Sequence, residues 1–420
     1  MKKIHYAWLV CAGCTLLLFC TVGLATSAFS VFLPYLIREG GLTNTQGSLI
    51  ITVRSMAALA SMLVVGPYLR RTGLRRGAAI AAALCALSFV LFGLATGFLG
   101  YCVASTVAGV AYGLGGMIPA SVLISRWFRD DRALALGICA AGSGVATVIA
   151  PPIATALIES SSLETAFLAN AAFAAAAAGL VAVVLKNTPQ EKGLEPFASA
   201  KVGAVLRPAA RQPEAGRGTI GYALVAIVMI GAIANPGFAH LSVLYEAAGF
   251  SGFRVSLLIS VVGAALTVGK CVYGRFADLM GARKSSLLFF GLLTAGQLLC
   301  CFAPVSGFPS AVAAMLLIGL GMPLSTVGLS VYAGDLSPSQ EEYGKTLKHF
   351  QIAYMAGSLL FGPMPGMLAD ATGSYVPAYV ILSAFSVAAM VLEQMSYRKK
   401  GSTHHTRPTG QAGVPCRQTA

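Results

Sequence analysis

The chain alternates long apolar runs with short polar gaps from one end to the other. Twelve apolar runs can be drawn, each near or above the roughly 20 residues that a helix needs to cross the hydrocarbon of a bilayer. They cover residues 7–35, 45–69, 77–95, 98–124, 133–158, 165–185, 219–245, 255–277, 285–303, 310–333, 350–369 and 376–394. The runs are rich in Gly and Ala and do not alternate with polar residues, so they predict helices rather than barrel strands. The expected fold class is an all-α membrane protein with twelve transmembrane helices.

Lys and Arg fall mainly in alternate gaps between these runs. The basic set is Lys2, Lys3, Arg70, Arg71, Arg75, Arg76, Arg126, Arg129, Arg132, the central gap, Arg283, Lys284, Lys345, Lys348 and residues 398–400. The other gaps hold Arg38 and Arg254 beside Glu39, Glu159, Glu164, Glu246 and Asp370. By the positive-inside rule both termini are cytoplasmic. The first run is too long for a cleaved signal peptide, so a multi-pass protein of the cell inner (plasma) membrane is expected.

Composition supports this reading. Hydrophobic residues make up 56% of the chain and charged residues 10%, against about 25% charged in soluble domains. The net charge of +14 does not predict nucleic-acid binding, because the basic residues follow the membrane topology. Most of the ten cysteines lie inside apolar runs, where they are expected to pack as small apolar residues. Cys11-x-x-Cys14 has no second ligand pair, so neither a metal nor a cofactor is expected.

The two halves of the chain repeat one another. Gly66-x-x-x-Arg70-x-x-Gly73-x-Arg75-Arg76 after the second run matches Gly274-x-x-x-Asp278-x-x-Gly281-x-Arg283-Lys284 after the eighth. Gly115-x-x-x-Pro119-x-Ser121 likewise matches Gly319-x-x-x-Pro323-x-Ser325. We therefore expect an N-terminal six-helix bundle (1–185), a flexible cytoplasmic linker (186–218), a C-terminal six-helix bundle (219–397) and a disordered cytoplasmic tail (398–420). Two such halves place a binding site at their interface near the midplane.

With these repeats the chain resembles the major facilitator superfamily over essentially its full length. The resemblance implies that Gly66, Gly73, Arg75, Gly274, Asp278, Gly281 and Arg283 belong to the loop signature that helps to hold the cytoplasmic gate. Arg70 departs from that signature, in which Asp is usual.

Within the superfamily, two stretches resemble the monocarboxylate and oxalate/formate branch. They are Arg126-Trp127-Phe128 with the Gly-rich segment 137–144, and Gly269-Lys270 shortly before Gly274. The resemblance implies that Lys270 contacts a substrate carboxylate. Leu266 replaces the acidic residue of animal monocarboxylate carriers, and the middle of the eleventh run lacks the Lys of oxalate carriers.

Arg54 and Lys270 are cations in the middle of apolar runs, with no Asp or Glu at a matching depth. Such a charge costs roughly 3 kcal/mol or more at the bilayer centre and usually faces a cavity with a partner. The simplest missing partner is a negatively charged substrate, and the two cations could form a clamp on it. The alternatives are a gate contact for Arg54 and carbonyl bonding for Lys270.

Other polar groups in the runs are weaker candidates. Asn235 precedes a Pro-Gly break in the seventh run, which could line a cavity or be a plain kink. Tyr112, Tyr354 and Gln351 could contact substrate or bond a neighbouring helix. His240 and His349 could carry protons, although ordinary interfacial histidines are the safer interpretation.

The leading hypothesis is a secondary carrier for a small organic anion, a mono- or dicarboxylate, working by alternating access as antiporter or proton symporter. No ATP-binding motif is present, so a gradient must drive it. Coupling is expected to bypass carboxylates of the protein, because each Asp and Glu falls in a gap or at a helix end. The expected partners are the anion, protons and the bilayer, and the carrier is expected to be monomeric. The alternatives are a carrier for a neutral metabolite or drug, with Arg54 and Lys270 structural, and more distantly a membrane enzyme or sensor.

Overall fold

The computed structural model describes residues 5–129, 132–198, 217–337 and 340–402. This part of the chain is almost entirely helical, and its only bridge of strand type joins Phe128 to Phe197. Within the described residues, twelve helices are long and apolar enough to cross a membrane, which confirms the predicted count and fold class. Large apolar side chains such as Leu99, Val183 and Leu360 stay exposed, as expected of a multi-pass membrane protein whose surface meets lipid.

The N-terminal bundle contains six spans. The first is a broken helix made of α1 (Tyr6–Leu18), a π-helical stretch η1 (Phe19–Ser27), a 3₁₀ stretch η2 (Ala28–Phe32) and α2 (Leu33–Glu39). The others are α3 (Asn44–Thr72), α4 (Leu74–Leu94), α5 (Gly97–Gly115) with α6 (Met117–Trp127), α7 (Arg132–Ser160) and α8 (Leu163–Val184).

The C-terminal bundle repeats this order. Its spans are α9 (Arg217–Ala239) with α10 (Leu241–Ala247), α11 (Gly252–Met280), α12 (Ala282–Cys301), α13 (Phe308–Gly321) with η5 (Met322–Ser325) and α14 (Val327–Leu336), α15 (Gln340–Phe361) with α16 (Met364–Thr372), and α17 (Val376–Ser402). Apolar clusters fill both bundles, one with Phe167 and another with Phe289, and the latter also includes Leu33 and Ile51 of the N-terminal bundle.

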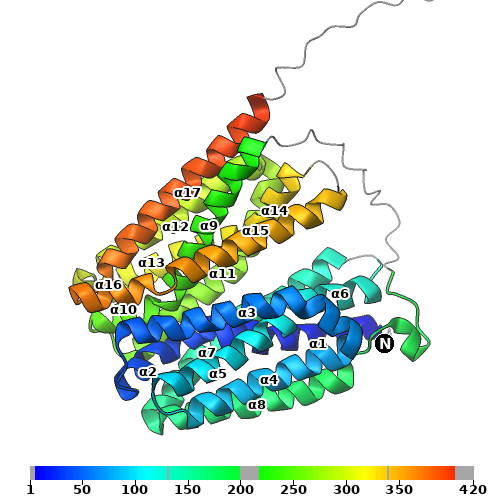
Figure 1. Ribbon diagram of the computed structural model, residues 1–420, viewed down its shortest axis with the longest axis horizontal. Helices are drawn as coiled ribbons and strands as arrows, with labels where there is room; N and C mark the ends of the chain where they lie inside the picture. Colours follow the sequence, from blue (N-terminus) through cyan, green and yellow to red (C-terminus); the bar gives the residue numbers. More distant parts are fainter. Residues whose placement is uncertain (1–4, 130–131, 199–216, 338–339, 403–420) are drawn as a thin grey trace, which may run out of the picture.

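The two bundles converge at one end and diverge at the other (Figure 1). Helix α3 runs beside α15 and α16, and α7 runs beside α11. Every hydrogen bond that joins the bundles within the described residues lies between mid-span and the end formed by α2, α10 and α16. These bonds join Arg38 to Glu246, Asn44 and Thr45 to Asp370, Asn44 to Tyr375, Ser48 to His240, Ser30 to Ser242, and Val148 to Ser260. We call this end the closed end.

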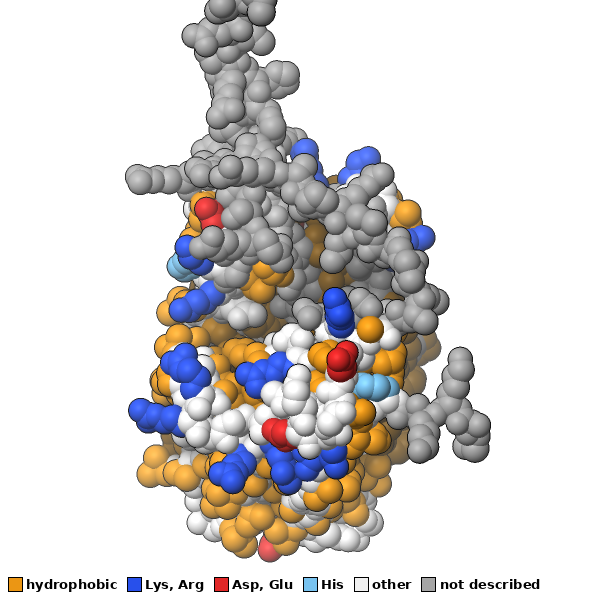
Figure 2. All heavy atoms as spheres, turned by 90° about the vertical axis from the view of Figure 1, so that its right-hand side faces the viewer, with side chains coloured by type: hydrophobic (Ala, Val, Ile, Leu, Met, Phe, Trp, Pro, Cys, Tyr) orange, Lys and Arg blue, Asp and Glu red, His pale blue; other side chains and the backbone are white. Residues whose placement is uncertain are grey.

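The opposite end carries the basic gaps of the sequence, and we call it the basic end. Figure 2 views it directly and shows Lys and Arg side chains gathered there, with few acidic ones among them. The ribbons of α6 and α14 are separated at this end, whereas α2 and α10 are in contact at the closed end (Figure 1). The conformation is therefore held together at the closed end and parted at the basic end.

The repeated loop signature takes the same shape in both bundles. Helices α3 and α11 end at Gly73 and Gly281, whose φ values of 76° and 81° lie where only glycine is unstrained. Arg75 then donates from Nε to the carbonyl of Ala182, and Arg283 donates from Nε to Gln394. Each signature arginine thus ties the third span of its bundle to the sixth. Gly66 and Gly274 have open space beside their Cα atoms, and the side chain of Asp278 lies outside the described residues.

The first part of the predicted flexible linker is packed against the N-terminal bundle. The ring of Phe197 lies 5.8 Å from Trp8 and 5.6 Å from Phe128, and its backbone bonds to Trp127. At Phe197 the expected flexible tether thus packs on aromatic side chains of the basic end, and the flexibility of the linker stays a prediction. Residues 199–216 and the tail from 403 lie outside the described residues, while α17 itself continues to Ser402.

Candidate functional site

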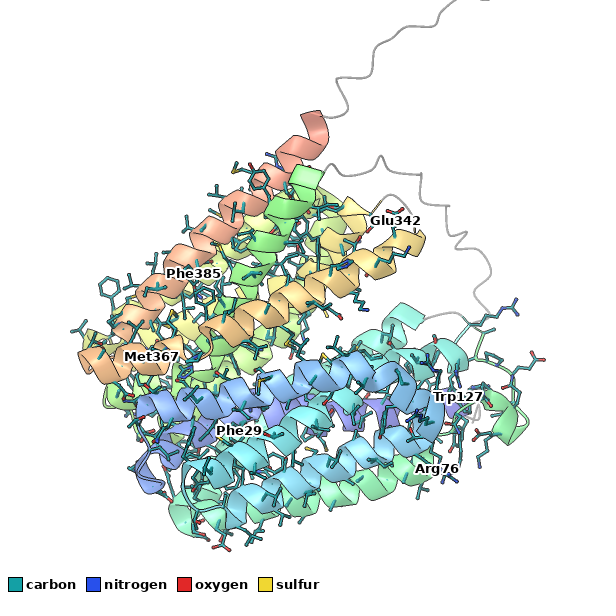
Figure 3. The ribbon with its side chains drawn as sticks, viewed as in Figure 1. Phe29, Arg76, Trp127, Glu342, Met367 and Phe385 are labelled. Atoms are coloured by element: carbon teal, nitrogen blue, oxygen red, sulfur yellow. The ribbon has the colours of Figure 1, made fainter. Side chains whose placement is uncertain are left out.

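Arg54 lies in the middle of α3 and is 5% exposed. Its Nη1 donates to the carbonyl oxygen of Ala25 at 2.8 Å, and its guanidinium carbon lies 5.0 Å from the centre of the Phe29 ring. Phe29 lies in the N-terminal bundle, towards the closed end (Figure 3). Within the described residues, no carboxylate oxygen comes within 4.0 Å of the guanidinium. The charge is thus buried with one carbonyl and one aromatic face.

The carbonyl that meets Arg54 comes from the π-helical stretch of the first span. Such stretches widen the helix locally and leave carbonyl groups that can bond outside it. Thr21 supports the widened turn by donating to the carbonyls of Leu17 and Gly115. Gly115 lets the backbones approach, since a Cβ there would lie 2.7 Å from Ala81. The local irregularity therefore depends on contacts between spans.

Arg54 opens onto a small cavity of about 40 Å³ between the two bundles. The cavity is lined by Thr26, Arg54, Ser55, Ala58 and Tyr112 of the N-terminal bundle and by Asn235, Tyr354 and Met355 of the C-terminal bundle. The hydroxyl oxygen of Thr26 is buried and has no hydrogen-bond partner in the described residues. One cation and several neutral polar groups thus converge on one space at the bundle interface.

Asn235 reaches the cavity from a helix that differs from the prediction. The Asn235-Pro236-Gly237 sequence stays inside α9, and the break follows at His240. Tyr379 donates to the carbonyl of Gly237 at 2.8 Å, which satisfies one backbone group near the proline. The side-chain nitrogen of Asn235 donates to Ser358 of α15 at 3.0 Å.

Lys270 does not line this cavity. Gly263 of α11 packs against Thr147 of α7, and Lys270 follows seven residues later on the same helical face. It therefore lies on the side of α11 that is turned to the other bundle. It is partly buried, and the described residues include no ion-pair partner for it.

The two cations lie at different depths. Arg54 bonds Ala25, and nearby Gly23 packs against Ala146 of α7. The next residue of α7, Thr147, packs against Gly263 of α11, so Arg54 and Gly263 lie at about the same level. Seven helical residues separate that level from Lys270, or roughly 10 Å towards the basic end. The predicted two-cation clamp is not assembled around one cavity in this conformation.

The remaining candidates lie apart from the cavity. Gln351 is exposed on α15, and His349 is exposed nearer the basic end. His240 is fully buried at the closed end, where Nδ1 bonds the carbonyl of Pro236 and Nε2 bonds Ser48 of the other bundle, each at 2.7 Å. Because a carbonyl only accepts, Nδ1 carries a proton, and Nε2 shares its hydrogen bond with the Ser48 hydroxyl. His240 thus links the two bundles here.

Sequence reasoning missed Thr26, Ser55 and Met355 as cavity residues. The signal for Thr26 was the cluster of hydroxyl-bearing and small residues at 21–27 inside an otherwise apolar run. It also missed Glu393, which is 3% exposed inside α17. The expectation that every carboxylate lies in a gap or at a helix end is wrong for Glu393, because α17 continues nine residues beyond it to Ser402.

Comparisons with known proteins agree with this architecture. The family model of the Major Facilitator Superfamily matches residues 15–266 and 222–418. Monocarboxylate transporter 12 of Xenopus laevis is 24% identical over 91% of this chain and 86% of its own length. The MFS-type transporter hasB of Aspergillus fumigatus is 24% identical over 92% and 87%. The crystal structure of the nucleoside transporter NupG superposes with a TM-score of 0.72 at 12% identity, over 94% of this chain and all of that one, which shows the fold alone.

The matching relatives and the fold are those of transporters, not enzymes. The chain belongs to the Major Facilitator Superfamily and is a transporter related to its monocarboxylate branch.

Proposed function

We propose that this protein is a secondary active transporter of a small organic anion, and that a carboxylate of the cargo binds Arg54. The observation that carries the proposal is a buried guanidinium at the bundle interface that faces a cavity and has no carboxylate partner among the described residues. The names of several relatives, which are monocarboxylate transporters, support the same class of cargo.

The donor arrangement suits a carboxylate. A guanidinium has five N–H donors in a planar fork, and the bond to Ala25 uses one of them in the described structure. A carboxylate accepts two parallel bonds from such a fork. Tyr112, Tyr354 and Asn235 can then bond further polar atoms of the cargo. That any of these residues touches substrate stays a prediction.

Lys270 has a separate role in the proposal. It stands roughly 10 Å nearer the basic end, on the path that opens there. We expect it to attract the anion from that side or to hold the second carboxylate of a dianion. We propose that the basic end is cytoplasmic, because Lys and Arg gather there, and that both termini are inside in a plasma-membrane protein. The transport mode, antiport or proton symport, is to be determined by measuring uptake.

One observation favours a second candidate function. The bond to Ala25 and the contact with Phe29 give Arg54 a structural role in holding the first span. If that role is its only one, the cargo is a neutral metabolite or drug.

Ligand-dependent thermal stability of the purified chain separates the two functions. A panel of small mono- and dicarboxylates is compared with chloride at equal ionic strength, since a ligand at about 100 times its Kd stabilises the folded state by about 2.7 kcal/mol. Loss of a bidentate charged contact costs about 3 kcal/mol, so Arg54→Gln should weaken binding roughly a hundredfold. Arg54→Lys, which keeps the charge but not the fork, should fall between.

The matched control is Arg254→Gln, which removes an exposed cation near the closed end. Carboxylate stabilisation that is equal in wild type and Arg54→Gln, or stabilisation by neutral compounds alone, would reject the anion proposal. Lys270→Ala is tested with uptake as well. Its expected effect is a slower rate at low substrate concentration, with thermal stabilisation by monocarboxylates retained.

A further inference from the structure

Glu393 is the buried carboxylate that the proposed transport site does not use. It lies in α17 near the basic end of the C-terminal bundle and is 3% exposed. It lines a small enclosed space together with Tyr273 of α11 and Tyr332 of α14, the rest of the lining being Ile230, Leu324, Gly328 and Leu329. The space lies inside one bundle, separate from the Arg54 cavity.

No cation neutralises this carboxylate among the described residues. Every Lys, Arg and His nitrogen there lies more than 4.0 Å from its oxygens. Arg283 comes near because its guanidinium bonds the partly buried side chain of Gln394, the residue after Glu393, at 2.9 Å. An unpaired charge at such a site is costly, and a carboxyl group avoids the cost by holding a proton.

The titratable groups near Glu393 include tyrosine hydroxyls and a second carboxylate, that of Asp335. Tyr332 shares a 2.5 Å hydrogen bond with Ser396, and Tyr397 donates to Asp335 at 3.2 Å. The elements around Glu393 contribute Tyr273 and Arg275 of α11, Arg283 and Lys284 of α12, Tyr332 and Asp335 of α14, and Tyr222 of α9. Arg275, Arg283 and Lys284 are exposed. A nearby acid such as Asp335 makes a second negative charge less favourable still.

The site also touches the helix that lines the transport cavity. Ile230 of α9 borders Glu393, and the next residue, Gly231, packs directly on the backbone carbonyl of Tyr354. Tyr354 and Asn235 line the Arg54 cavity. A change at Glu393 that moves α9 therefore reaches the cavity through adjacent contacts.

We propose that Glu393 is a proton-binding site of this carrier, loaded in the conformation described here and unloaded when the basic end of the C-terminal bundle loosens. Release breaks the O–H bond of the carboxyl group, leaves the electron pair on the carboxylate and transfers the proton to water at the basic end. Uptake is the reverse. The site makes the conformational cycle respond to the proton concentration on that side, whatever the cargo.

Infrared difference spectroscopy on the full chain in lipid tests this directly. A step from about pH 6 to about pH 9 should remove the C=O stretching band of a buried protonated carboxyl group in wild type. Glu393→Gln should lack that band, and the matched control Glu164→Gln, which alters an exposed carboxylate near the closed end, should keep it. Asp335→Asn should keep it too.

Thermal unfolding gives a second readout that needs no substrate. Raising the pH forces a charge onto Glu393 in wild type but not in Glu393→Gln, so wild type should lose more thermal stability towards alkaline pH than the variant does. Glu393→Met serves as a second uncharged variant if the Gln variant folds poorly. A band that persists in Glu393→Gln, a band that vanishes only in Asp335→Asn, or equal alkaline destabilisation of all variants would each overturn the proposal. Failure of carboxylate binding at Arg54 would leave these results unchanged.

Discussion

Asp370 of α16 binds the start of α3 across the bundle interface, and its removal should open the closed end. Its Oδ1 accepts from the backbone N–H of Asn44 at 3.0 Å and from the Asn44 side chain at 2.8 Å. Its Oδ2 accepts from the backbone N–H and hydroxyl of Thr45 at 2.8 and 2.5 Å. The first N–H groups of a helix have no partner within it and carry its positive dipole end. One carboxylate therefore satisfies two of them from the other bundle.

The size of the effect follows from the exposure of the site. Asp370 is exposed, so its charge is screened and the contact is weaker than four buried ionic bonds would be. A lost helix cap costs about 1 kcal/mol and a lost charge at the helix N-terminus about 0.3–1 kcal/mol. Asp370→Asn should thus shift the opening equilibrium by about 1–2 kcal/mol, or roughly 5- to 30-fold.

Pulsed electron paramagnetic resonance measures that shift. Spin labels at Ser161 and Val305, both exposed near the closed end, report the distance between bundles when the exposed Cys271 and the tail Cys416 are replaced by Ser. The longer-distance population should grow in Asp370→Asn. The reasoning is refuted if the distance distribution of the variant equals that of wild type.

The matched control for this experiment is Glu164→Gln. Glu164 is an exposed carboxylate in the first turn of α8, and the described structure gives it no bond to the other bundle. An equal shift in this variant would mean that net charge at the closed end, and not the Asp370 contact, sets the equilibrium.

Two further predictions concern packing and the second polar contact between the bundles. Gly357→Ala should lower the melting temperature by an amount that corresponds to about 1–3 kcal/mol, because its Cβ would meet the backbone carbonyl of Val228. Gly179→Ala, with open space beside it, should leave the melting temperature unchanged. At the closed end, burial raises the pKa of the Glu246 carboxyl group, and the Arg38 guanidinium 3.0 Å away lowers it by less. A carboxyl group whose pKa is raised on folding contributes stability that is lost as the pH rises through its folded pKa. Glu246→Gln should therefore flatten the dependence of stability on pH above the unfolded pKa. The same variant should open the closed end less than Asp370→Asn does. Thermal melts across that pH range and the same spin labels measure both outcomes.

The sequence alone predicted the spans because span length is dictated by the bilayer rather than by tertiary contacts. It could not predict where helices break. The π-helical stretch at Phe19–Ser27 depends on Thr21 bonding Gly115 and on Arg54 bonding Ala25, which are contacts between spans. A contact between spans also accompanies the Pro-Gly pair in α9: Tyr379 bonds the Gly237 carbonyl, and the helix stays continuous until Ala239.

The candidate site was partly predictable for a related reason. A polar group inside an apolar run must face protein or a cavity, which is why Arg54, Tyr112, Asn235 and Tyr354 could be singled out. Sequence gives no relative depth between spans, so the offset of Lys270 from Arg54 was not predictable as a distance. Glu393 stands one residue before the end of its apolar run at 394, where exposure is the natural expectation.

The hydrogen bonds between the bundles gather at the closed half of the molecule, and each bundle is closely packed inside, which favours motion of the bundles as rigid bodies. Inside the C-terminal bundle, Gly231 and Gly357 bring the α9 and α15 backbones into direct contact. Such close packing admits few alternative arrangements. At the closed end, hydrogen bonds join the bundles, some exposed like those of Asp370 and some buried like that of Ser48 with His240, each worth about 1 kcal/mol. A cargo that bridges Arg54 and the C-terminal bundle would add a contact of similar size. One bound anion therefore offsets part of the energy needed to break the closed-end bonds, and new contacts at the basic end must supply the rest.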